Sequence, residues 1–376
     1  MLSKKITKGA LLLLAIAFMI IVFKMLSKSD DADQKAFTQL DTLFGELYPA
    51  DEPGAAVLIL KGDDIIYEKG FGIADIETKE PVTGKTFFNI ASVSKQFSGV
   101  ALMMLHEEGK LSLDDNLASF FPQFQASFFQ NITLRHLLSH TSGIPDSRPR
   151  HDRNFVLTAT DEASCVYLET LDKLNFEPGT AYEYMNPTFQ LMYMIVEKAS
   201  GMQFDEFMRT RIFDLAGMPE AVYFEADKTI PHLSHGYIPN RDSEGFQECD
   251  YGETSFFATK ADGGLYTSVE EFVQWEKALR NNLLLSKEMS DEAWSKKIDI
   301  PEIPYTGYGY GWFIEERPEF PKKVYHTGDN GGYQIFAGRY PDKGILYLIF
   351  ATCNDKDRED TVEKVDQIMK AAGWLD

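Results

Sequence analysis

Strand patterns near both ends of the chain, with helical patterns between them, constrain the fold more than any other feature of this sequence. Two early strands are predicted at residues 54–60 and 65–69, joined by a turn at Gly62. Four late strands are predicted at residues 308–315, 323–326, 334–340 and 345–351. Helical patterns separated by loops rich in Pro and Gly fill the middle. The arrangement predicts one sheet built from both ends of the chain, with a helical domain inserted into it.

The domain boundaries follow from the same patterns. A sheet domain is predicted in two pieces, residues 35–110 and 290–372, and a mostly helical domain over residues 111–289. Apolar residues at helical spacing predict that the first piece opens with a helix that ends before Pro49. A closing helix is predicted over residues 360–372.

The first residues have the composition of an export segment. An uncharged apolar run covers residues 9–23, and basic residues stand on both sides of it: Lys4, Lys5, Lys8, Lys24 and Lys28. Basic residues before an apolar run are typical of an export signal whose N-terminus stays in the cytoplasm. We therefore expect a basic cytoplasmic tip (residues 1–8), a membrane anchor or signal segment (residues 9–26) and a linker (residues 27–34). The rest of the chain is expected outside the cytoplasm, either periplasmic or extracellular.

The sequence favours an anchor that stays attached, although cleavage remains an alternative. Ala15 and Ala17 form the A-x-A pattern of a cleavage site, but cutting there would leave the apolar residues 18–23 at the mature terminus. The run is short for a full span, which usually takes roughly 20 apolar residues. The uncleaved form would be a single-pass membrane protein, and in both cases the catalytic part is exported.

The charge of the chain excludes several classes of partner. Lys and Arg total 37 and Asp and Glu total 58, which gives a net charge of -21. Such a surface repels phosphate backbones and anionic headgroups, so nucleic acid is not expected as a partner. Contact with a membrane is expected through the N-terminal segment only. The oligomeric state stays open.

No pattern indicates a metal site or a disulfide framework. Cys165, Cys249 and Cys353 are far apart and odd in number. His136 and His140 stand four residues apart, but they lack a third ligand and the glutamate of an H-E-x-x-H motif. We expect both histidines to be structural.

The first candidate catalytic pair is Ser92 and Lys95, at the start of a helix predicted over residues 92–106. Residues three apart on a helix lie on one face, so the hydroxyl and the amine can meet. Backbone N–H groups and the positive end of the helix favour negative charge there. An activated nucleophile needs such a base and such a stabilised anion. Taken alone, the pattern also fits a capped helix with a solvated lysine.

Two later motifs add candidates. Tyr184 and Asn186 follow a Pro-Gly turn, and Asn186 is predicted to cap a helix that has Pro187 at its first position. A tyrosinate beside a lysinium could act as a base, because the cation lowers the phenol pKa. His326 and Gly328 form an H-x-G motif at the end of a late strand, where a glycine lets a ligand backbone approach the strand edge.

In this order, S-x-x-K, Y-x-N and H-x-G resemble the signature set of serine β-lactamases and penicillin-binding proteins, in particular the class C and D,D-peptidase or esterase branch. The resemblance covers roughly residues 35–370. Longer segments also match that branch: FNIASVSKQF (88–97), GKLSLDD (109–115), ITLRHLLSHTSGIP (132–145), ADGGLYTSVEEFVQW (261–275) and YGYGW (308–312). The resemblance implies an α+β fold in which helices flank an antiparallel sheet and the active site lies between the sheet and the helical domain.

The resemblance also implies roles for the catalytic residues. Ser92 would be the acylated nucleophile and Lys95 its general base or proton relay. Tyr184 would be the second member of that relay and would pass a proton to the leaving group.

Four further residues would bind the substrate. Asn186 would hold the substrate amide, and His326 stands where the penicillin-binding enzymes have a lysine. Gly328 completes the motif, and the backbone N–H groups of Ser92 and Asp329 would form the oxyanion hole. The family more often has a small residue at the position of Asp329, which here would add a carboxylate near the developing anion. Tyr308, in the late YGYGW segment, is expected to pack rather than to line the cleft.

The sequence thus predicts an exported serine hydrolase that acts through a Ser92 acyl-enzyme on a small amide, lactam or ester. β-Lactamase-like, D,D-peptidase and esterase activities stay open, and the substrate would be a small molecule or peptide. No metal or organic cofactor is expected. The alternative is a membrane-anchored penicillin-binding receptor or scaffold on the same fold, without significant turnover.

Overall fold

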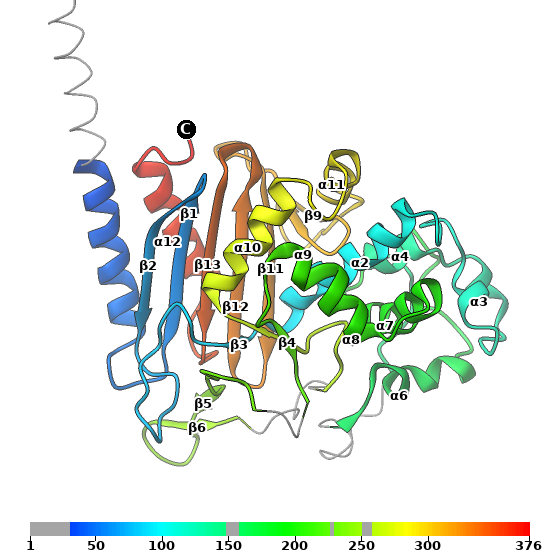
Figure 1. Cartoon of the computed structure of the whole chain (residues 1–376), viewed down its shortest axis with the longest axis horizontal. Helices are drawn as coiled ribbons and strands as arrows, with labels where there is room; N and C mark the ends of the chain where they lie inside the picture. Colours follow the sequence, from blue (N-terminus) through cyan, green and yellow to red (C-terminus); the bar gives the residue numbers. More distant parts are fainter. Residues whose placement is uncertain (1–30, 148–157, 226–228, 250–257) are drawn as a thin grey trace, which may run out of the picture. The chain divides into compact units, whose positions relative to one another are not determined.

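An eight-stranded antiparallel sheet forms the centre of the larger part of the chain, in the order β2-β1-β13-β12-β11-β10-β9-β8. The computed structural model describes residues 31–147, 158–225, 229–249 and 258–376. The strands are β1 (Ala55–Lys61), β2 (Asp64–Phe71), β8 (Ile298–Asp299), β9 (Thr306–Tyr308), β10 (Phe313–Glu315), β11 (Lys323–Asn330), β12 (Tyr333–Tyr340) and β13 (Ile345–Ala351). Figure 1 shows the early, blue strands beside the late, orange-red ones.

The sheet joins the two ends of the chain, as the sequence predicts. β1 pairs with β13 over its whole length, from Ala55 opposite Ala351 to Lys61 opposite Ile345. Both strands are buried almost throughout, and such continuous apolar runs are typical of strands covered on both faces. The α+β fold with an antiparallel sheet built from early and late strands is therefore confirmed.

Two late strands differ from their predicted bounds. The stretch predicted as one strand over residues 308–315 is two strands, β9 and β10, because the chain turns between them. Gly311 has φ +90° and Gly309 N–H donates to the Trp312 carbonyl at 2.8 Å. β11 continues to Asn330, four residues past the predicted end at His326.

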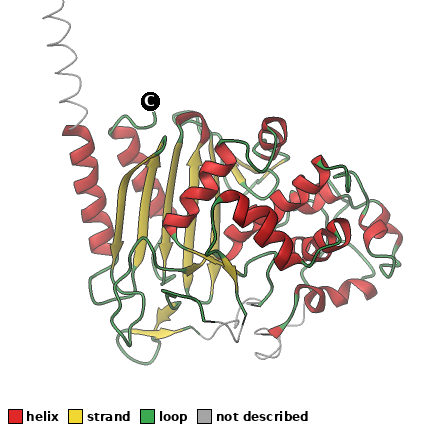
Figure 2. Cartoon of the chain, in the orientation of Figure 1, coloured by secondary structure: helices red, strands yellow, loops and turns green. Residues whose placement is uncertain are grey.

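The helices between the early and late strands lie mostly apart from the sheet, whereas α10 crosses one face of it and contacts β1 and β13 (Figure 2). They are η1 (Ala91–Ser94), α2 (Lys95–Glu107), α3 (Leu117–Phe120), η2 (Ser127–Gln130), α4 (Leu134–Leu138), α6 (Asp161–Cys165), η3 (Val166–Thr170), α7 (Asn186–Ser200), α8 (Phe204–Phe207), η4 (Met208–Phe213), α9 (Asp214–Ala216), α10 (Val269–Arg280) and α11 (Lys287–Ala293). The short η5 (Pro341–Lys343) connects β12 and β13. The short strands are β3 (Phe88–Asn89), β4 (Val222–Tyr223), β5 (Tyr237–Pro239), β6 (Phe246–Glu248) and β7 (Leu265–Thr267).

Helix α2 is the centre of the core beside the sheet. Every residue from Lys95 to Leu105 is buried, and a helix that is buried all round needs neighbours on every face. Phe97 stacks on Trp275 of α10 with ring centroids 4.0 Å apart, and α7 packs along another face. This packing fixes the start of α2, and with it Ser92 and Lys95.

The chain forms two compact units, of which residues 48–356 are the larger. The described part of the smaller unit is the helix at residues 31–47 and α12 (Arg358–Ala371) with the end of the chain. Trp374 joins the two helices, since its Nε1 donates to Asp33 at 2.6 Å and its ring lies 5.8 Å from that of Phe37.

The N-terminal predictions are only partly covered by the structure. The first described helix includes residues 31–34, which the sequence places in a linker. The predicted membrane segment at residues 9–26 lies outside the described residues. Among the helices that the structure does describe, none is long and apolar enough to cross a membrane. The domain boundaries near residues 110 and 290 stay a prediction.

Candidate active site

Ser92 lies on the tight turn between β3 and α2. The predicted helix begins at Lys95, and the residues just before it form the 3₁₀ turn η1. Ala91 has φ +47°, which is unusual for a residue with a side chain and costs on the order of 1–3 kcal/mol. The Asn89 carboxamide holds this conformation, because its Oδ1 accepts the Ala91 N–H at 2.8 Å. The strained turn leaves Ser92 half-buried, while its neighbours on both sides are buried.

Lys95 is completely buried, with 0% of its surface exposed. Its Nζ lies 2.9 Å from Ser92 Oγ, 2.8 Å from Asn186 Oδ1 and 2.8 Å from the Asp262 carbonyl oxygen. The last two atoms can only accept hydrogen bonds, so they take two N–H groups of the amine. The third position faces Ser92, where a neutral amine would direct its lone pair. The ammonium form donates to Ser92 at this position, and after loss of a proton the same geometry lets the amine act as a base toward the hydroxyl.

Asn186 differs from its predicted role as a helix cap. The cap of α7 is Met185, and Asn186 is the first helical residue, so Pro187 follows one position later than predicted. No side chain caps this helix. The Asn186 carboxamide is used for Lys95 instead, since its oxygen accepts from the amine. The predicted helix end at Gly201 is confirmed, with φ +73°.

Tyr184 brings a buried hydroxyl to the same place. The residue as a whole is half-buried, but its hydroxyl is buried and has no hydrogen-bond partner within the described parts of the chain. Its ring centroid is 5.1 Å from Lys95 Nζ. Burial raises the pKa of the Tyr184 phenol well above 10, although the nearby Ser92 hydroxyl lowers it in part. The predicted lowering of this pKa is therefore wrong, because burial raises it and the nearby Tyr182, Asp262 and Asp329 raise it further, and the phenol stays protonated.

Strand β11 runs directly beside the nucleophile turn. A Cβ added at Gly328 would lie 2.5 Å from the Ile90 carbonyl oxygen and 3.2 Å from Ser92 N. Residue 328 must therefore be glycine so that β11 can approach the nucleophile turn of the same chain. The sequence predicts instead that this glycine admits the backbone of a ligand. Side chains alternate along a strand, so Asp329 lies on the face opposite Gly328, where it is exposed.

β10 pairs with β11 only at residues 323–325. From His326 to Asn330, no described strand continues the pairing on that edge of β11, which lies next to the nucleophile turn.

His326 is buried beneath this edge, at 1% exposure. Its Nδ1 lies 2.6 Å from the Thr327 carbonyl oxygen, which can only accept, so Nδ1 carries a proton. Its Nε2 lies 2.9 Å from the Tyr308 hydroxyl. In the neutral ring, Nε2 therefore accepts a hydrogen bond from the Tyr308 hydroxyl. Tyr308 is buried and packs as predicted, and through this hydrogen bond it also orients His326.

The comparison with known proteins agrees with this geometry. A family model described as Beta-lactamase matches residues 40–369. The chain belongs to the β-lactamase family. Penicillin-binding protein 4* of Bacillus subtilis (strain 168) is 31% identical over 347 residues, which cover 89% of this chain and 74% of that protein. The chain is therefore a serine hydrolase of the β-lactamase-related family, as the sequence predicts.

Two further matches support the same family and fold. Protein flp of Staphylococcus aureus (strain MRSA252) is 24% identical over 324 residues, which cover 85% of this chain and 63% of that protein. The octameric penicillin-binding protein homologue from Pyrococcus abyssi has 28% identity and a TM-score of 0.75. That match covers 90% of this chain and 77% of the other.

In this β-lactamase family member, the loop behind Lys95 contributes residues that the sequence analysis missed. The Asp262 carbonyl accepts from Lys95, while its carboxylate accepts from Thr259 Oγ1 at 2.7 Å and from Gln190 Nε2 at 3.1 Å. These contacts fix the carbonyl that orients the amine. The segment 261–275 carries part of the resemblance to the family. The sequence could not indicate that the Asp262 carbonyl binds Lys95, because every residue has a main-chain carbonyl.

Asp161 holds the same loop from α6. Its two carboxyl oxygens accept the N–H groups of Lys260 at 2.8 Å and Ala261 at 3.0 Å. Burial, together with the nearby Asp262, raises the pKa of the Asp161 carboxyl to about 8, in spite of these two donors. An acid from a distant helix thus positions the loop that contacts Lys95.

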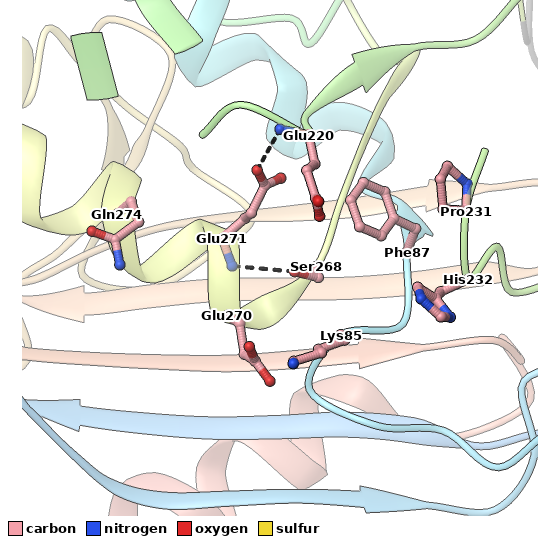
Figure 3. Close-up of a pocket in the computed structure, with 9 residues that line it drawn as sticks. All are labelled: Lys85, Phe87, Glu220, Pro231, His232, Ser268, Glu270, Glu271 and Gln274. Atoms are coloured by element: carbon pink, nitrogen blue, oxygen red, sulfur yellow. Dashed lines mark hydrogen bonds between the residues drawn. The ribbon is translucent and has the colours of Figure 1, made fainter. Parts of the chain in front are cut away.

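A separate cavity of about 430 Å³ lies at the start of α10 (Figure 3). Its lining is Lys85, Phe87, Glu220, Pro231, His232, Ser268, Glu270, Glu271 and Gln274. None of these is a predicted site residue. Glu271 is already used inside the fold, since it accepts the Glu220 N–H at 2.7 Å.

The two histidines predicted to be structural occupy different positions. His136 closes a capping box at the start of α4, where its Nδ1 accepts the Thr133 N–H at 3.1 Å. His140 lies at the Tyr184 ring, with centroids 4.2 Å apart. Throughout the described residues, no group of three or more His, Cys, Asp or Glu side chains could hold a metal ion.

Proposed function

We propose that the protein hydrolyses small amides, lactams or esters through an acyl-enzyme on Ser92. The observation that carries this proposal is the 2.9 Å contact between Ser92 Oγ and the buried Lys95 amine. Lys95 is buried, and burial disfavours the charged form of an amine, which favours its action as a base. Its hydrogen bonds to Asn186 Oδ1 and the Asp262 carbonyl fix the position of the amine.

In the acylation step, Ser92 Oγ attacks the substrate carbonyl carbon and its proton passes to the Lys95 amine. The bond to the leaving group then breaks, and the leaving nitrogen or oxygen takes a proton from the Tyr184 hydroxyl, which Lys95 reprotonates. Tyr184 suits this step because its phenol stays protonated. Water then attacks the ester carbonyl carbon and gives a proton to the same groups. The bond from this carbon to Ser92 Oγ breaks, Oγ takes that proton, and the carboxylic acid product leaves.

Substrate binding is assigned to the edge of β11 and to Asn186. The N–H groups of Ser92 and Asp329 would bind the oxyanion, and the substrate would lie along β11 beside the nucleophile turn. Gly328 lets this strand approach the nucleophile turn. His326 would position the substrate from below, without taking part in proton transfer.

The reaction needs no metal or organic cofactor, because nucleophile, base and acid are all side chains of this chain. The family includes a penicillin-binding protein at 31% identity, which supports cyclic and linear amides with a D-amino-acid-like acyl part as substrates to test first. Esters belong in the same test, since they pass through the same acyl-enzyme.

We also propose that the protein is exported and anchored by the segment at residues 9–26. The support is the apolar run with lysines on both sides. Sequencing the N-terminus of the mature protein tests the anchor. A native terminus beyond residue 23 would reject the anchor but would agree with export.

A labelled penicillin and a fluorophosphonate probe, followed by intact-mass and peptide mapping, test the proposed nucleophile. We expect one adduct on Ser92 and none in the folded Ser92→Ala variant. An adduct on another residue, or none with either reagent, would overturn the proposal. A stable adduct together with no turnover of chromogenic esters, D-aminoacyl amides or a cephalosporin would instead favour the non-hydrolytic receptor.

A further inference from the structure

The backbone N–H groups of the residues before and after Tyr184 are both bound by one residue, His140. The N–H of Glu183, just before the tyrosine, donates to the His140 carbonyl at 3.0 Å. The N–H of Met185, just after it, donates to His140 Nδ1 at 3.2 Å. A single side chain and its own carbonyl therefore fix the backbone on which the phenol stands.

The imidazole also supports the phenol ring. The two ring centroids are 4.2 Å apart at an interplanar angle of 38°, and the rings of Tyr308 and Phe189 lie 4.8 Å and 5.0 Å from the imidazole. His140 itself is 1% exposed. The phenol thus packs against a ring that has no room to turn away.

Only the neutral ring can make these contacts. Nδ1 accepts the Met185 N–H, so the proton of the neutral ring is on Nε2, which has no hydrogen-bond partner in the part of the chain that the structure describes. Burial and the charge of Lys95 hold the pKa of His140 well below 6.5. At neutral pH the acceptor is therefore present, and no second cation stands beside Lys95.

The backbone of His140 is also unusual. It has φ +56°, in the left-handed region that side chains with a Cβ rarely adopt. The Thr188 hydroxyl lies beside this contact: it donates to the Met185 carbonyl at 2.7 Å and is 3.3 Å from His140 Nδ1. Loss of the His140 ring would remove the acceptor that the half-buried Met185 N–H uses here, and a donor that loses its acceptor favours a shift of the backbone.

We infer that His140 is a positioning residue for proton transfer, which acts by holding the peptide groups and the ring of Tyr184 in place. This inference rests on the proposed function. The sequence predicts a structural role for His140, and the structure makes this residue the support of the proposed proton donor.

Two substitutions that both accept φ +56° separate the acceptor from the rest of the side chain. His140→Gly removes ring and acceptor, whereas His140→Asn restores an acceptor at the position of Nδ1. We expect the kcat of His140→Gly to fall about a hundredfold, since a small misplacement of a catalytic group has effects of that size. KM should change little, and His140→Asn should recover most of kcat. If the glycine variant does not fold, His140→Phe, which keeps a ring without an acceptor, takes its place.

The same change in a Tyr184→Phe background shows whether His140 acts through Tyr184. Without the hydroxyl, His140→Gly should cost little further activity. A folded His140→Gly variant with wild-type kcat, or an equal loss in both backgrounds, would overturn the inference alone. A wild-type protein that neither hydrolyses any substrate nor acylates at Ser92 would overturn the proposed function as well.

Discussion

Lys95 Nζ lies 2.9 Å from Ser92 Oγ, and the lysine that makes this contact has no exposed surface. The two residues are three apart, across the junction of a 3₁₀ turn and an α-helix. The remaining partners of the amine, Asn186 and Asp262, come from 91 and 167 residues away along the chain. A local spacing and two distant acceptors together orient the amine toward the hydroxyl.

Removal of Lys95 should slow acylation of Ser92. In Lys95→Ala the hydroxyl loses its base, and we expect the acylation rate to fall about a hundred- to ten-thousand-fold. Rapid-quench kinetics with a labelled penicillin or fluorophosphonate measure the rate, and thermal melts verify folding. Lys323→Ala is the control, because Lys323 is also a buried lysine, at 3% exposure. It pairs with Glu315 at 3.3 Å instead of contacting Ser92. Wild-type acylation in folded Lys95→Ala would contradict the role of the amine.

Lys95 and Tyr184 should lose activity as one unit. Tyr184→Phe removes only the hydroxyl, and each single change should cost most of kcat/KM. The double variant should cost little more, because either loss already interrupts the same proton path. Steady-state kinetics of the four proteins give the coupling. Losses that multiply in full would show that the two groups act independently.

His326→Ala should be milder than either of these changes. His326 is held by Tyr308 at 2.9 Å and is assigned to positioning, so we expect a rise in KM larger than the loss in kcat. Tyr308→Phe removes the donor to Nε2 and should change kcat/KM by an amount near the value of one hydrogen bond, about 0.5–1.5 kcal/mol. A loss in His326→Ala as large as that of Lys95→Ala would place His326 in the proton path.

Gly328→Ala should disrupt the nucleophile turn. The new Cβ would lie 2.5 Å from the Ile90 carbonyl oxygen, so either β11 or the turn must move. We expect kcat/KM to fall about a hundredfold or more, because the oxyanion donors and Ser92 would no longer match. Gly45→Ala is the control, as it meets nothing within 4 Å. Activity in Gly328→Ala equal to that of the control would show that this close approach is not required.

Asp161 should make stability fall as pH rises. Its pKa in the folded protein is about 8 and its ordinary value is 3.8, so between these values the folded state holds a proton that the unfolded state has lost. The free energy of unfolding should then decrease by up to about 1.4 kcal/mol per pH unit, and this loss should end above pH 8. Urea unfolding of the wild type and Asp161→Asn at pH 6, 7 and 8 isolates the slope. The same slope in both proteins would mean that Asp161 is already ionised when folded.

Several parts of the fold and the site follow from local sequence. The strands near residues 55–61 and 345–351 have continuous apolar runs, and Gly201 ends α7 as predicted. The spacing of Ser92 and Lys95 predicts that they meet, because it depends only on helical geometry. Local sequence did not predict the turn between β9 and β10. The glycines in that stretch are also compatible with an extended chain, so the residues read as one continuous strand.

The sequence by itself determined one sheet of early and late strands and a Ser92–Lys95 pair on one face, since periodicity and short spacings are local properties. The antiparallel pairing and the catalytic roles of the pair were implied by the resemblance to the family. Only the tertiary structure decided that Asn186 binds Lys95 rather than capping a helix, and that a carbonyl of residue 262 completes the amine's partners. It also reversed the expected direction of the Tyr184 pKa. These features depend on burial and on main-chain atoms brought together over long separations, and neither is encoded in the type of a residue or in its neighbours.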